Sequence, residues 1–252
     1  MIEVKNLNKS FDETQVLKDI SVSFNTGQTN LIIGQSGSGK TVLMKCIIAL
    51  YSPDSGSISY DGRDVVKMKP SELRTLRQEM GMLFQGSALF DSMTVAENVM
   101  FPLEMFSGND LETRKARVDF CLQRVELTHA HDLYPSEISG GMQKRAAIAR
   151  AIALNPKYLF CDEPNSGLDP KTAIVIDKLI QEITREYNIT TVINTHDMNS
   201  VMEIGENIVF IYKGEAAWKG SSDDLYISDN ELLNDFVFAS DLFKKIRNSH
   251  TV

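Results

Sequence analysis

The chain has 252 residues, of which 42% are hydrophobic, enough to bury the core of one large domain or of a core with a smaller subdomain. Acidic residues outnumber basic ones, 34 to 26, and the net charge of -8 argues against broad electrostatic binding to nucleic acid or to an anionic membrane. Cys46, Cys121 and Cys161 lie far apart in the sequence and favour neither a disulfide framework nor a zinc site. We therefore expect a globular protein of a reducing cytosol, with no nucleic-acid partner.

The N-terminal stretch lacks the apolar segment of a signal peptide. No window reaches 18 uninterrupted apolar residues either, because Lys45 interrupts the richest run. We expect any membrane role to be peripheral and to depend on a partner.

Two segments near the N-terminus alternate apolar with polar residues, as half-buried antiparallel strands do. They are residues 2–4 and 20–24, and a turn is expected between them at Asp12 to Thr14. Phe11 precedes this turn. Its ring could stack on a purine, and packing in the core explains it equally well.

A glycine-rich loop follows a short apolar strand at residues 31–33 and fits the pattern G-x-x-x-x-G-K-[ST]. Backbone N–H groups of such a loop point at phosphate, the helix N-terminus adds partial positive charge, and Lys40 adds a full one. Thr41 would offer its hydroxyl to Mg2+. The alternative is a glycine-rich turn without a ligand. The residues expected to surround the nucleotide here are Gly34, Gln35, Ser36, Gly37, Ser38, Gly39, Lys40, Thr41 and Val42.

The next segments alternate between helix and strand signals. A helix from Lys40 to Leu50 ends in a cluster of breakers, a strand at residues 57–60 leads into the hairpin turn Asp61–Gly62, and residues 71–78 read as a short helix. A buried strand at residues 80–84 then runs into Gln85. Its side-chain oxygen could reach a metal or the attacking water, although a glutamine at a strand end is often only polar surface.

Residues 87–150 read as an inserted helical subdomain. Thr94 and Glu97 form a capping box there. Its last helix begins at Ser139, Gly140 and Gly141, which make a second anion-binding helix N-terminus far in sequence from the first. A plain helix start is the alternative.

Two acids close the next buried strand, at residues 158–161. Strand alternation would point Asp162 and Glu163 in different directions, so that one serves the metal and the other the water; a surface turn is the alternative. Asp169 is expected to cap a helix that starts at Pro170. His196 follows the strand at residues 189–194 and could touch a γ-phosphate, although a lone histidine is more often structural. A helix that runs to Ile204 is expected next, with Gly205 as its C-cap.

A last hairpin is expected at residues 208–218, with its turn at Lys213–Gly214. The tail from Ser222 reads as helical, and it either covers the core or contacts a partner. It ends in the basic residues Lys244, Lys245 and Arg247. Its apolar set is Leu232, Leu233, Phe236, Val237, Leu242 and Phe243.

These motifs, in this order, resemble those of the nucleotide-binding subunit of an ABC transporter over about residues 1–220. The resemblance implies an α/β fold: a P-loop NTPase ABC-type core with an antiparallel β subdomain and an inserted α-helical subdomain at about residues 87–150. Residues 1–220 would form the ATPase domain, and residues 221–252 a C-terminal helical extension. The implied motifs are Walker A at Gly34–Thr41, the Q-loop at Gln85, the signature at Ile138–Met142, Walker B at Tyr158–Asp162, the D-loop at Ser166–Asp169 and the switch His196.

The same resemblance implies a head-to-tail homodimer that hydrolyses ATP with Mg2+. Ser139, Gly140 and Gly141 of one subunit would contact the γ-phosphate held by the other, close to Asp169, and Phe11 would stack on the base. The implied catalytic residues are Glu163 as base, His196, Lys40 and Gln85. The implied metal ligands are Thr41, Gln85 and Asp162.

Three positions depart from the family's usual residues: Met142 at the end of the signature, Phe11, and Val42 after Thr41. Val42 and Met142, together with the segment GSALFDSMTVAENV after Gln85, resemble the Mla-type branch. That branch implies phospholipid transport through an integral-membrane permease and an MCE-domain partner, at the cytoplasmic face of the inner membrane. The alternatives are the ATPase of another ABC importer, for amino acids or ions, a soluble ABC protein of iron–sulfur assembly or translation, and a nucleotide-binding module that does not hydrolyse.

Overall fold

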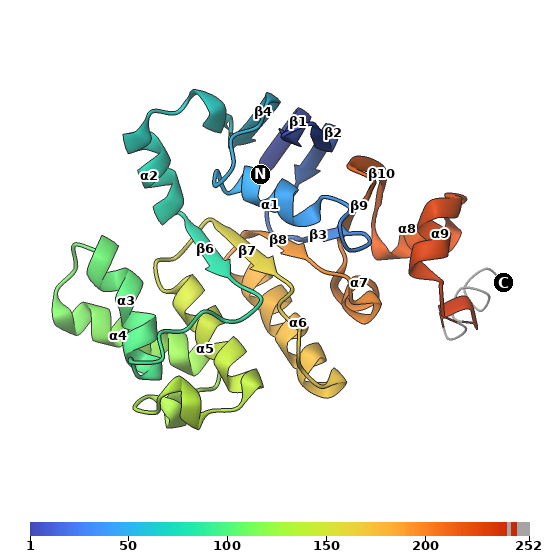
Figure 1. Ribbon diagram of the computed structural model, residues 1–252. Helices are drawn as coiled ribbons and strands as arrows, with labels where there is room; N and C mark the ends of the chain where they lie inside the picture. Colours follow the sequence, from blue (N-terminus) through green and yellow to red (C-terminus); the bar gives the residue numbers. More distant parts are fainter. Residues whose placement is uncertain (241–242, 246–252) are drawn as a thin grey trace.

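Two β-sheets organise the chain, and the computed structural model describes them within residues 1–240 and 243–245 (Figure 1). The smaller sheet is antiparallel, in the order β2-β1-β4-β5, and consists of β1 (Ile2–Phe11), β2 (Thr14–Phe24), β4 (Ser55–Tyr60) and β5 (Arg63–Asp64). The larger sheet has the order β10-β9-β3-β8-β7-β6 and is parallel except for the β9–β10 hairpin. Its strands are β3 (Thr29–Ile33), β6 (Met80–Leu83), β7 (Tyr158–Asp162), β8 (Thr190–Asn194), β9 (Asn207–Tyr212) and β10 (Glu215–Gly220).

Helices connect and cover these strands. The α-helices are α1 (Lys40–Ile47), α2 (Pro70–Gln78), α3 (Val95–Phe106), α4 (Leu111–Arg124), α5 (Gly140–Ile152), α6 (Pro170–Glu186), α7 (Met198–Ile204), α8 (Ser222–Ile227) and α9 (Glu231–Val237). Short 3-10 helices occur at Val65–Lys67, Thr128–Ala130 and Pro135–Glu137. Within the described residues, no helix is both long and apolar enough to cross a membrane.

The expected caps and tight turns are confirmed. Thr94 accepts a hydrogen bond from the N–H of Glu97 and Glu97 caps back, while Asp169 caps α6 with Pro170 in its first turn. The β4–β5 and β9–β10 turns each place two consecutive residues at positive φ, 48° and 82° at residues 61 and 62 and 47° and 86° at residues 213 and 214. These are the conformations that two-residue hairpins require.

Two helix ends differ from the expectation. α1 ends at Ile47 rather than Leu50, because Ala49 has turned into the left-handed region with φ 57°. Gly205 does follow α7, but its φ of -77° is not that of a left-handed cap. It is glycine for a steric reason, since a Cβ there would lie 2.4 Å from the carbonyl oxygen of Val201.

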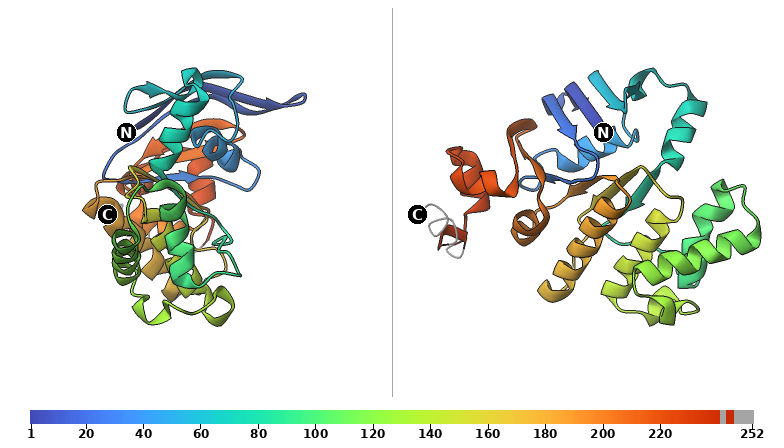
Figure 2. Two further views of the ribbon diagram at one scale, coloured as in Figure 1. Left: turned by 90° about the vertical axis from the view of Figure 1, so that its left-hand side faces the viewer. Right: turned by 180° about the vertical axis from the view of Figure 1, so that it is seen from behind.

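Strand alternation divides the core into two layers on opposite faces of the larger sheet (Figure 2). Ile32 packs with α1 and the antiparallel sheet. Leu31 and Ile33, on either side of it, pack with the helices of the opposite face. Because both faces are covered, the strand reads as an unbroken apolar run, as is typical of a buried parallel strand. The glycine-rich loop therefore starts from a rigid strand.

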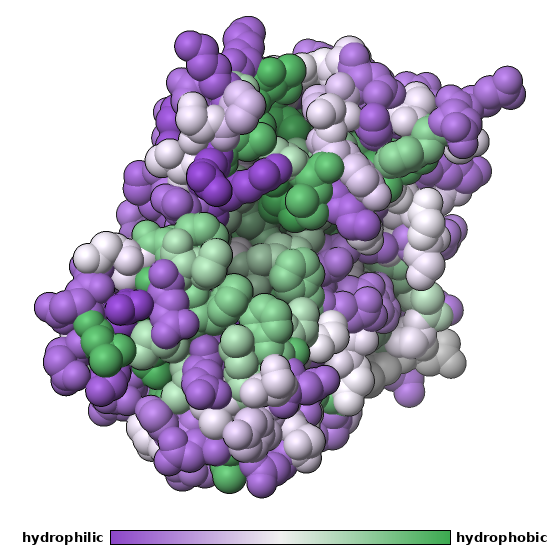
Figure 3. Space-filling model, turned by 60° about the vertical axis from the view of Figure 1, so that its left-hand side comes forward, coloured by the Kyte–Doolittle hydropathy of each residue, from purple (hydrophilic) through white to green (hydrophobic). Residues whose placement is uncertain are grey.

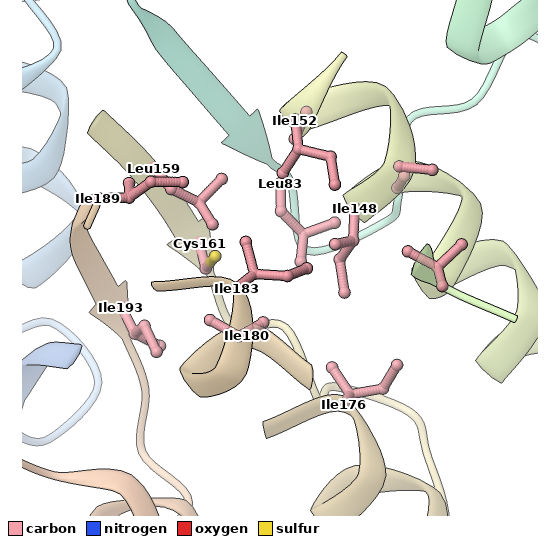
Figure 4. Packing of buried hydrophobic residues seen from close by; sticks show 14 of the residues in the cluster. Leu83, Ile148, Ile152, Leu159, Cys161, Ile176, Ile180, Ile183, Ile189 and Ile193 are labelled. Atoms are coloured by element: carbon pink, nitrogen blue, oxygen red, sulfur yellow. The ribbon is translucent and has the colours of Figure 1, made fainter. Parts of the chain in front are cut away.

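The layer below the larger sheet is built from isoleucines and leucines of α5 and α6. Figure 4 shows Ile148 and Ile152 of α5 beside Leu83 of β6, and Ile180 and Ile183 of α6 toward β7 and β8. Burial of one such side chain contributes about 1.5–3 kcal/mol. This packing fixes the helical segment between β6 and β7 onto the strands that carry the candidate site.

An apolar groove of about 1060 Å³ opens on the face shared by α2, β6 and α3. Figure 3 shows the apolar surface that surrounds it. Three arginines, Arg74, Arg77 and Arg150, lie among its lining residues. Its large apolar lining side chains are Met80, Met82, Phe84, Phe90, Phe101, Met105 and Phe106.

The tail packs on the β9–β10 edge of the larger sheet. The ring of Phe236 stacks on Phe210 of β9 with centroids 5.2 Å apart, and Leu233 and Val237 are buried. The expectation of a core-covering helix is confirmed for these residues.

One member of the predicted apolar set is misassigned, and two predictions concern residues that have no described position. Leu232 is 44% exposed, because it lies on the outer side of α9. Leu242 and Arg247 lie outside the described residues.

Candidate functional site

The glycine-rich loop is held in an extended, left-handed path between β3 and α1. Gly34 has φ 149°, and a Cβ there would lie 2.3 Å from the carbonyl oxygen of Ile211. Gly39 has φ 110° and lies against β2, where a Cβ would meet the carbonyl oxygen of Val16 at 3.1 Å. Neither position accepts another residue without displacing backbone. Of the other expected loop residues, Gln35, Ser36, Gly37 and Thr41 are exposed, Val42 is half-buried and Ser38 is buried.

Lys40 turns back over this loop. Its side chain is 7% exposed, and Nζ donates to the carbonyl oxygens of Gly34 at 2.8 Å and Gln35 at 3.0 Å. Burial lowers the pKa of Lys40, while the nearby carboxylates of Glu163 and Asp162 oppose that change. An ammonium group with two of its three protons held by the loop has a third for a ligand.

The β9–β10 turn supports the loop from outside. The N–H of Gly214 donates to the carbonyl oxygen of Ser38 at 3.0 Å, and the carbonyl of Gly214 accepts from the N–H of Lys18 at 2.8 Å. The sequence identified Gly214 only as a turn residue. This contact joins segments about 180 residues apart, and no local pattern reports it.

Asp162, the last residue of β7, and Glu163 after it do point in different directions, but strand alternation is not the reason. β7 ends at Asp162, and Glu163 is left-handed, with φ 47°. The N–H of Glu163 donates to the carbonyl oxygen of Asn194 at 2.8 Å, which holds this turn. A left-handed glutamate costs about 1–2 kcal/mol and persists only where its surroundings fix it.

The structure brings Gln85, Glu163 and His196 into one hydrogen-bonded group. Nε2 of Gln85 donates to Oε2 of Glu163 at 2.9 Å, and Nδ1 of His196 lies 3.0 Å from Oε1. Because an ionised carboxylate only accepts, Nδ1 carries the proton. Gln85 also donates to the hydroxyl of Ser166 at 3.2 Å, which adds the loop before α6 to the group.

Two cations of α5 hold the segment after Gln85 through its carbonyl oxygens. Lys144, buried in α5, donates to the carbonyl of Gln85. Arg150 donates to the carbonyls of Ser87 at 2.8 Å and Ala88 at 2.7 Å. Both of these residues have positive φ, 60° and 49°. Neither Lys144 nor Arg150 has a role that the sequence alone indicates.

The helix start that the sequence predicts as a second anion site is formed, with Ser139 as its N-cap. Ser139 is exposed, and its hydroxyl accepts from the N–H of Met142 at 3.3 Å. A Cβ on Gly141 would lie 2.7 Å from Cγ2 of Thr172, so this end of α5 packs against the start of α6, which Asp169 caps. The chain thus presents Ser139, Gly140, Gly141 and Asp169 together, and among the described residues no hydrogen bond joins their side chains to Glu163.

Phe11 lies at the tip of the β1–β2 hairpin and is 40% exposed. Its ring meets Tyr51 edge to face, with centroids 5.3 Å apart. Nζ of Lys9 lies over the same ring, 5.3 Å from its centroid. Tyr51 was read from the sequence only as part of a helix-ending cluster.

Two buried polar atoms support a phosphate and cation site at this edge. Oγ of Ser38 in the loop and Oδ1 of Asn194 at the end of β8 have no hydrogen-bond partner among the described residues. Buried polar groups are almost always hydrogen-bonded, so each marks a place for a ligand or its water. The oxygens of Thr41 and Asp162 lie around Asn194, and oxygen donors are those that Mg2+ prefers.

Comparison with known proteins agrees with this geometry. The family model described as ABC transporter matches residues 17–166. The methionine import ATP-binding protein MetN of Vibrio vulnificus is 40% identical over 242 residues, covering 94% of this chain and 70% of that protein. The chain belongs to the ABC transporter family. Within it, the chain is an ATP-binding ATPase cassette.

Two further relatives define the range of this family. A probable ribonucleotide transport ATP-binding protein of Mycobacterium leprae is 36% identical over 236 residues, covering 94% of this chain and 68% of that protein. The dimeric ATP-binding cassette MJ0796, solved in a post-hydrolysis state with ADP and Pi, is 33% identical, with a TM-score of 0.79 over 88% of this chain and 99% of that one. The α/β fold with an ABC-type core that the sequence predicted is confirmed.

Proposed function

We propose that this chain is the ATPase subunit of an ABC importer, in which two copies hydrolyse ATP between them and drive a membrane permease. The observation that carries the proposal is the division of the site. Lys40, Asp162, Glu163 and His196 gather at one edge of the sheet, while the helix start at Ser139 presents backbone donors elsewhere. The dimeric state of a solved relative supports a second copy as the partner of each half.

ATP would be bound by the loop from Gly34 to Thr41, with Phe11 against the base. Lys40 and the loop N–H groups would stabilise charge on the β- and γ-phosphates. The buried hydroxyl of Ser38 would gain the partner it lacks. Val42 follows the loop at the start of α1.

Thr41, Asp162 and Gln85 would hold Mg2+ together with the phosphate oxygens. When bound, this ion neutralises charge that spreads onto the phosphoryl oxygens during transfer. The chain supplies one carboxylate and two neutral oxygens. That set suits an ion whose remaining ligands are water and phosphate.

Glu163 would orient and polarise the water that attacks the γ-phosphorus. Gln85 and His196 fix its two carboxylate oxygens and so set the direction of the remaining lone pairs. Ser139, Gly140 and Gly141 of the second copy, near its Asp169, would contact the γ-phosphate from the opposite side. ATP then joins the two copies, and hydrolysis releases them.

The permease would dock in the apolar groove between α2 and α3. Its large Met and Phe side chains are adaptable and apolar, and its arginines supply a charged border. The groove includes Ala88 and Phe90 of the segment that starts at Gln85, so an occupant would contact the catalytic group through that segment. We place the subunit at the cytoplasmic face of the inner membrane. We divide the chain into an ATPase domain at 1–220, with its helical insert at 87–150, and a C-terminal extension at 221–252.

Because several relatives are named for methionine import, methionine or a similar amino acid is the first cargo to test. A relative of similar identity is named for ribonucleotide transport, so identity alone does not decide the cargo. The second candidate is phospholipid transport with an MCE-domain partner. The segment GSALFDSMTVAENV and the Met- and Phe-rich groove that it borders favour that candidate.

The test is recovery of partners from detergent-solubilised membranes of the native host, with proteins and lipids identified by mass spectrometry. Phe106→Glu, at a groove residue that is 48% exposed, should lower recovery of the permease about tenfold or more. Phe120→Glu is the matched control, because Phe120 is 42% exposed on α4 and does not line the groove. ATP hydrolysis by the isolated subunit should be unchanged in both.

The identity of the recovered partners decides the cargo class. A permease recovered with a solute-binding protein supports import of an amino acid, whereas a permease with an MCE-domain protein and phospholipid supports the second candidate. Equal recovery with both variants would refute docking in the groove. Recovery of no membrane protein would refute the transporter assignment and leave the ATPase chemistry.

A further inference from the structure

A buried amide lies between the two side chains that would hold the cation. Asn194, the last residue of β8, is 1% exposed. Its Nδ2 donates to Oδ1 of Asp162 at 2.6 Å, and Thr41 Oγ1 lies 3.5 Å from the same nitrogen. Its Oδ1 is buried and accepts no hydrogen bond from the part of the chain that the structure describes.

The position of this amide follows from strand register. β7 and β8 are parallel neighbours, and Asp162 pairs with Asn194. Phe160 and Val192, two residues earlier, face the layer of α1. Alternation points Asp162 and Asn194 to the same layer, where Thr41 opens α1. Cys161 and Ile193, between them, point to the opposite layer around α6 (Figure 4).

Chemistry fixes the orientation of the amide. An ionised carboxylate accepts and cannot donate, so the NH2 group of Asn194 and not its oxygen faces Asp162. One N–H is directed to Asp162, and the second is available to Thr41. Each of these partners keeps further lone pairs for a cation. The amide oxygen is left as a buried acceptor beside the site, where a water bound to the ion would supply the missing donor.

We propose that Asn194 is a positioning residue for the divalent cation: it fixes the oxygens of Asp162 and Thr41 and accepts a hydrogen bond from a water on the ion. The inference rests on the proposed function, in which these two residues and Gln85 would hold Mg2+. It adds a residue whose amide contacts two of the three proposed protein ligands and whose backbone carbonyl holds the turn at Glu163. One residue thereby connects the metal ligand to the residue that orients the water.

The experiment measures the gain in ATP affinity that Mg2+ produces, in the Glu163→Gln background, which removes hydrolysis from the measurement. Affinity is determined by calorimetry once with excess EDTA and once with saturating Mg2+. Asn194→Leu keeps the size of the side chain and removes its hydrogen bonds. We expect ATP affinity in EDTA to stay the same, and the gain from Mg2+ to fall about 10–100-fold.

Asn194→Ser is a second variant, which keeps part of the hydrogen bonding and tests whether the gain from Mg2+ follows it. Its hydroxyl keeps one donor for Asp162 but cannot serve Thr41 as well, so its gain from Mg2+ should lie between those of the parent and the leucine variant. Thr191→Val is the matched control. Thr191 is a buried polar residue of the same strand whose hydroxyl bonds Thr184 at 2.6 Å, on the side of α6. It should lower thermal stability and leave the gain from Mg2+ at the parent value.

The outcomes separate this inference from the proposed function. A parent whose ATP affinity does not respond to Mg2+ would overturn the metal site, and the inference with it. A parent that responds, with Asn194→Leu responding equally, would overturn the inference alone. An equal loss in Thr191→Val would also overturn it, because the effect would then follow from any buried polar loss in β8.

Discussion

The two glycine-bearing helix starts of this chain, at Lys40 and at Gly140, differ in what surrounds them. Lys40 is buried in its loop, and two carboxylates act on its charge. The start of α5 is exposed, and its serine hydroxyl caps its own helix. Enclosure supplies fixed charge and fixed geometry, whereas exposure leaves backbone donors available to a second molecule. In the proposed dimer, the second site of one copy would complete the first site of the other.

The largest effect is expected at the enclosed site. Glu163→Gln removes the group that polarises the water, while the amide can still pair with Gln85 and His196. Turnover should fall about 10²–10⁴-fold, and ATP binding should persist with a longer-lived dimer. Phosphate release and ATP-dependent elution in gel filtration measure the two effects. Turnover close to that of the parent would exclude this role for Glu163.

The exposed helix start allows its structural and functional roles to be separated. Asp caps a helix as well as Ser, so Ser139→Asp should keep the parent melting temperature. Its carboxylate would repel the γ-phosphate, and hydrolysis should fall about 10²–10³-fold without loss of ATP binding. Ser139→Ala removes the helix cap and should lower the free energy of unfolding by about 1 kcal/mol. It should keep more ATP hydrolysis than Ser139→Asp. An active, stable Ser139→Asp chain would contradict the composite site.

Mixing two inactive chains sharpens the same comparison. Ser139→Arg blocks the exposed half, and Glu163→Gln blocks the enclosed half. A mixed dimer contains one site with both defects and one site with neither. Equal mixing should restore about a quarter of the parent rate, because half of randomly paired dimers are mixed. No recovery would show that both halves of a site belong to the same chain.

A smaller effect is expected from a buried carboxylate behind the enclosed site. Asp177 of α6 is 2% exposed, and burial raises its pKa from 3.8 to about 6, against hydrogen bonds from Ser200 and Asn165. Because the folded pKa is the higher one, the stability that this group contributes is present below pH 4 and is lost as pH rises through 6. The loss at pH 8 is about 3 kcal/mol. Asp177→Asn should therefore be more stable than the parent at pH 8, with the difference shrinking toward pH 4.5 in urea unfolding. A difference independent of pH would contradict this account.

The smallest effect concerns the support of the loop. Gly214→Ala places a Cβ 2.4 Å from the carbonyl oxygen of Val16, at φ 86°, and should cost about 2 kcal/mol in unfolding free energy. ATP affinity should fall as well, because Gly214 donates to Ser38. Gly62→Ala is the matched control, since Gly62 has φ 82° in a similar turn with open space around it; it should cost about 1 kcal/mol and leave ATP binding unchanged. If Gly214→Ala and Gly62→Ala changed ATP affinity equally, Gly214 would not support the glycine-rich loop.

Local chemistry explains what the sequence could predict. Caps at Thr94, Ser139 and Asp169, the two-residue turns and the loop pattern depend on neighbours a few positions apart, and all of them are found in the structure. The grouping of Gln85, Glu163 and His196 required the family resemblance, because their distances depend on which strands are neighbours.

Register and tertiary contacts explain the rest. Asn194 reads as the polar end of a β-branched strand until β8 is aligned with β7 beside Asp162. The left-handed turn at Glu163 has no local signal, since glutamate rarely adopts it. Gly214 and Lys144 act on segments distant in sequence, which a single sequence does not reveal.

The segment after Gln85 has a mechanical consequence. Ser87 and Ala88 have positive φ, a backbone conformation that residues with side chains rarely adopt. Arg150 donates hydrogen bonds to the carbonyl oxygens of both residues, and Lys144 donates to the carbonyl oxygen of Gln85. These hydrogen bonds fix the segment to α5. A tilt of α5 relative to the sheet would therefore displace Gln85 and strain its hydrogen bond to Glu163.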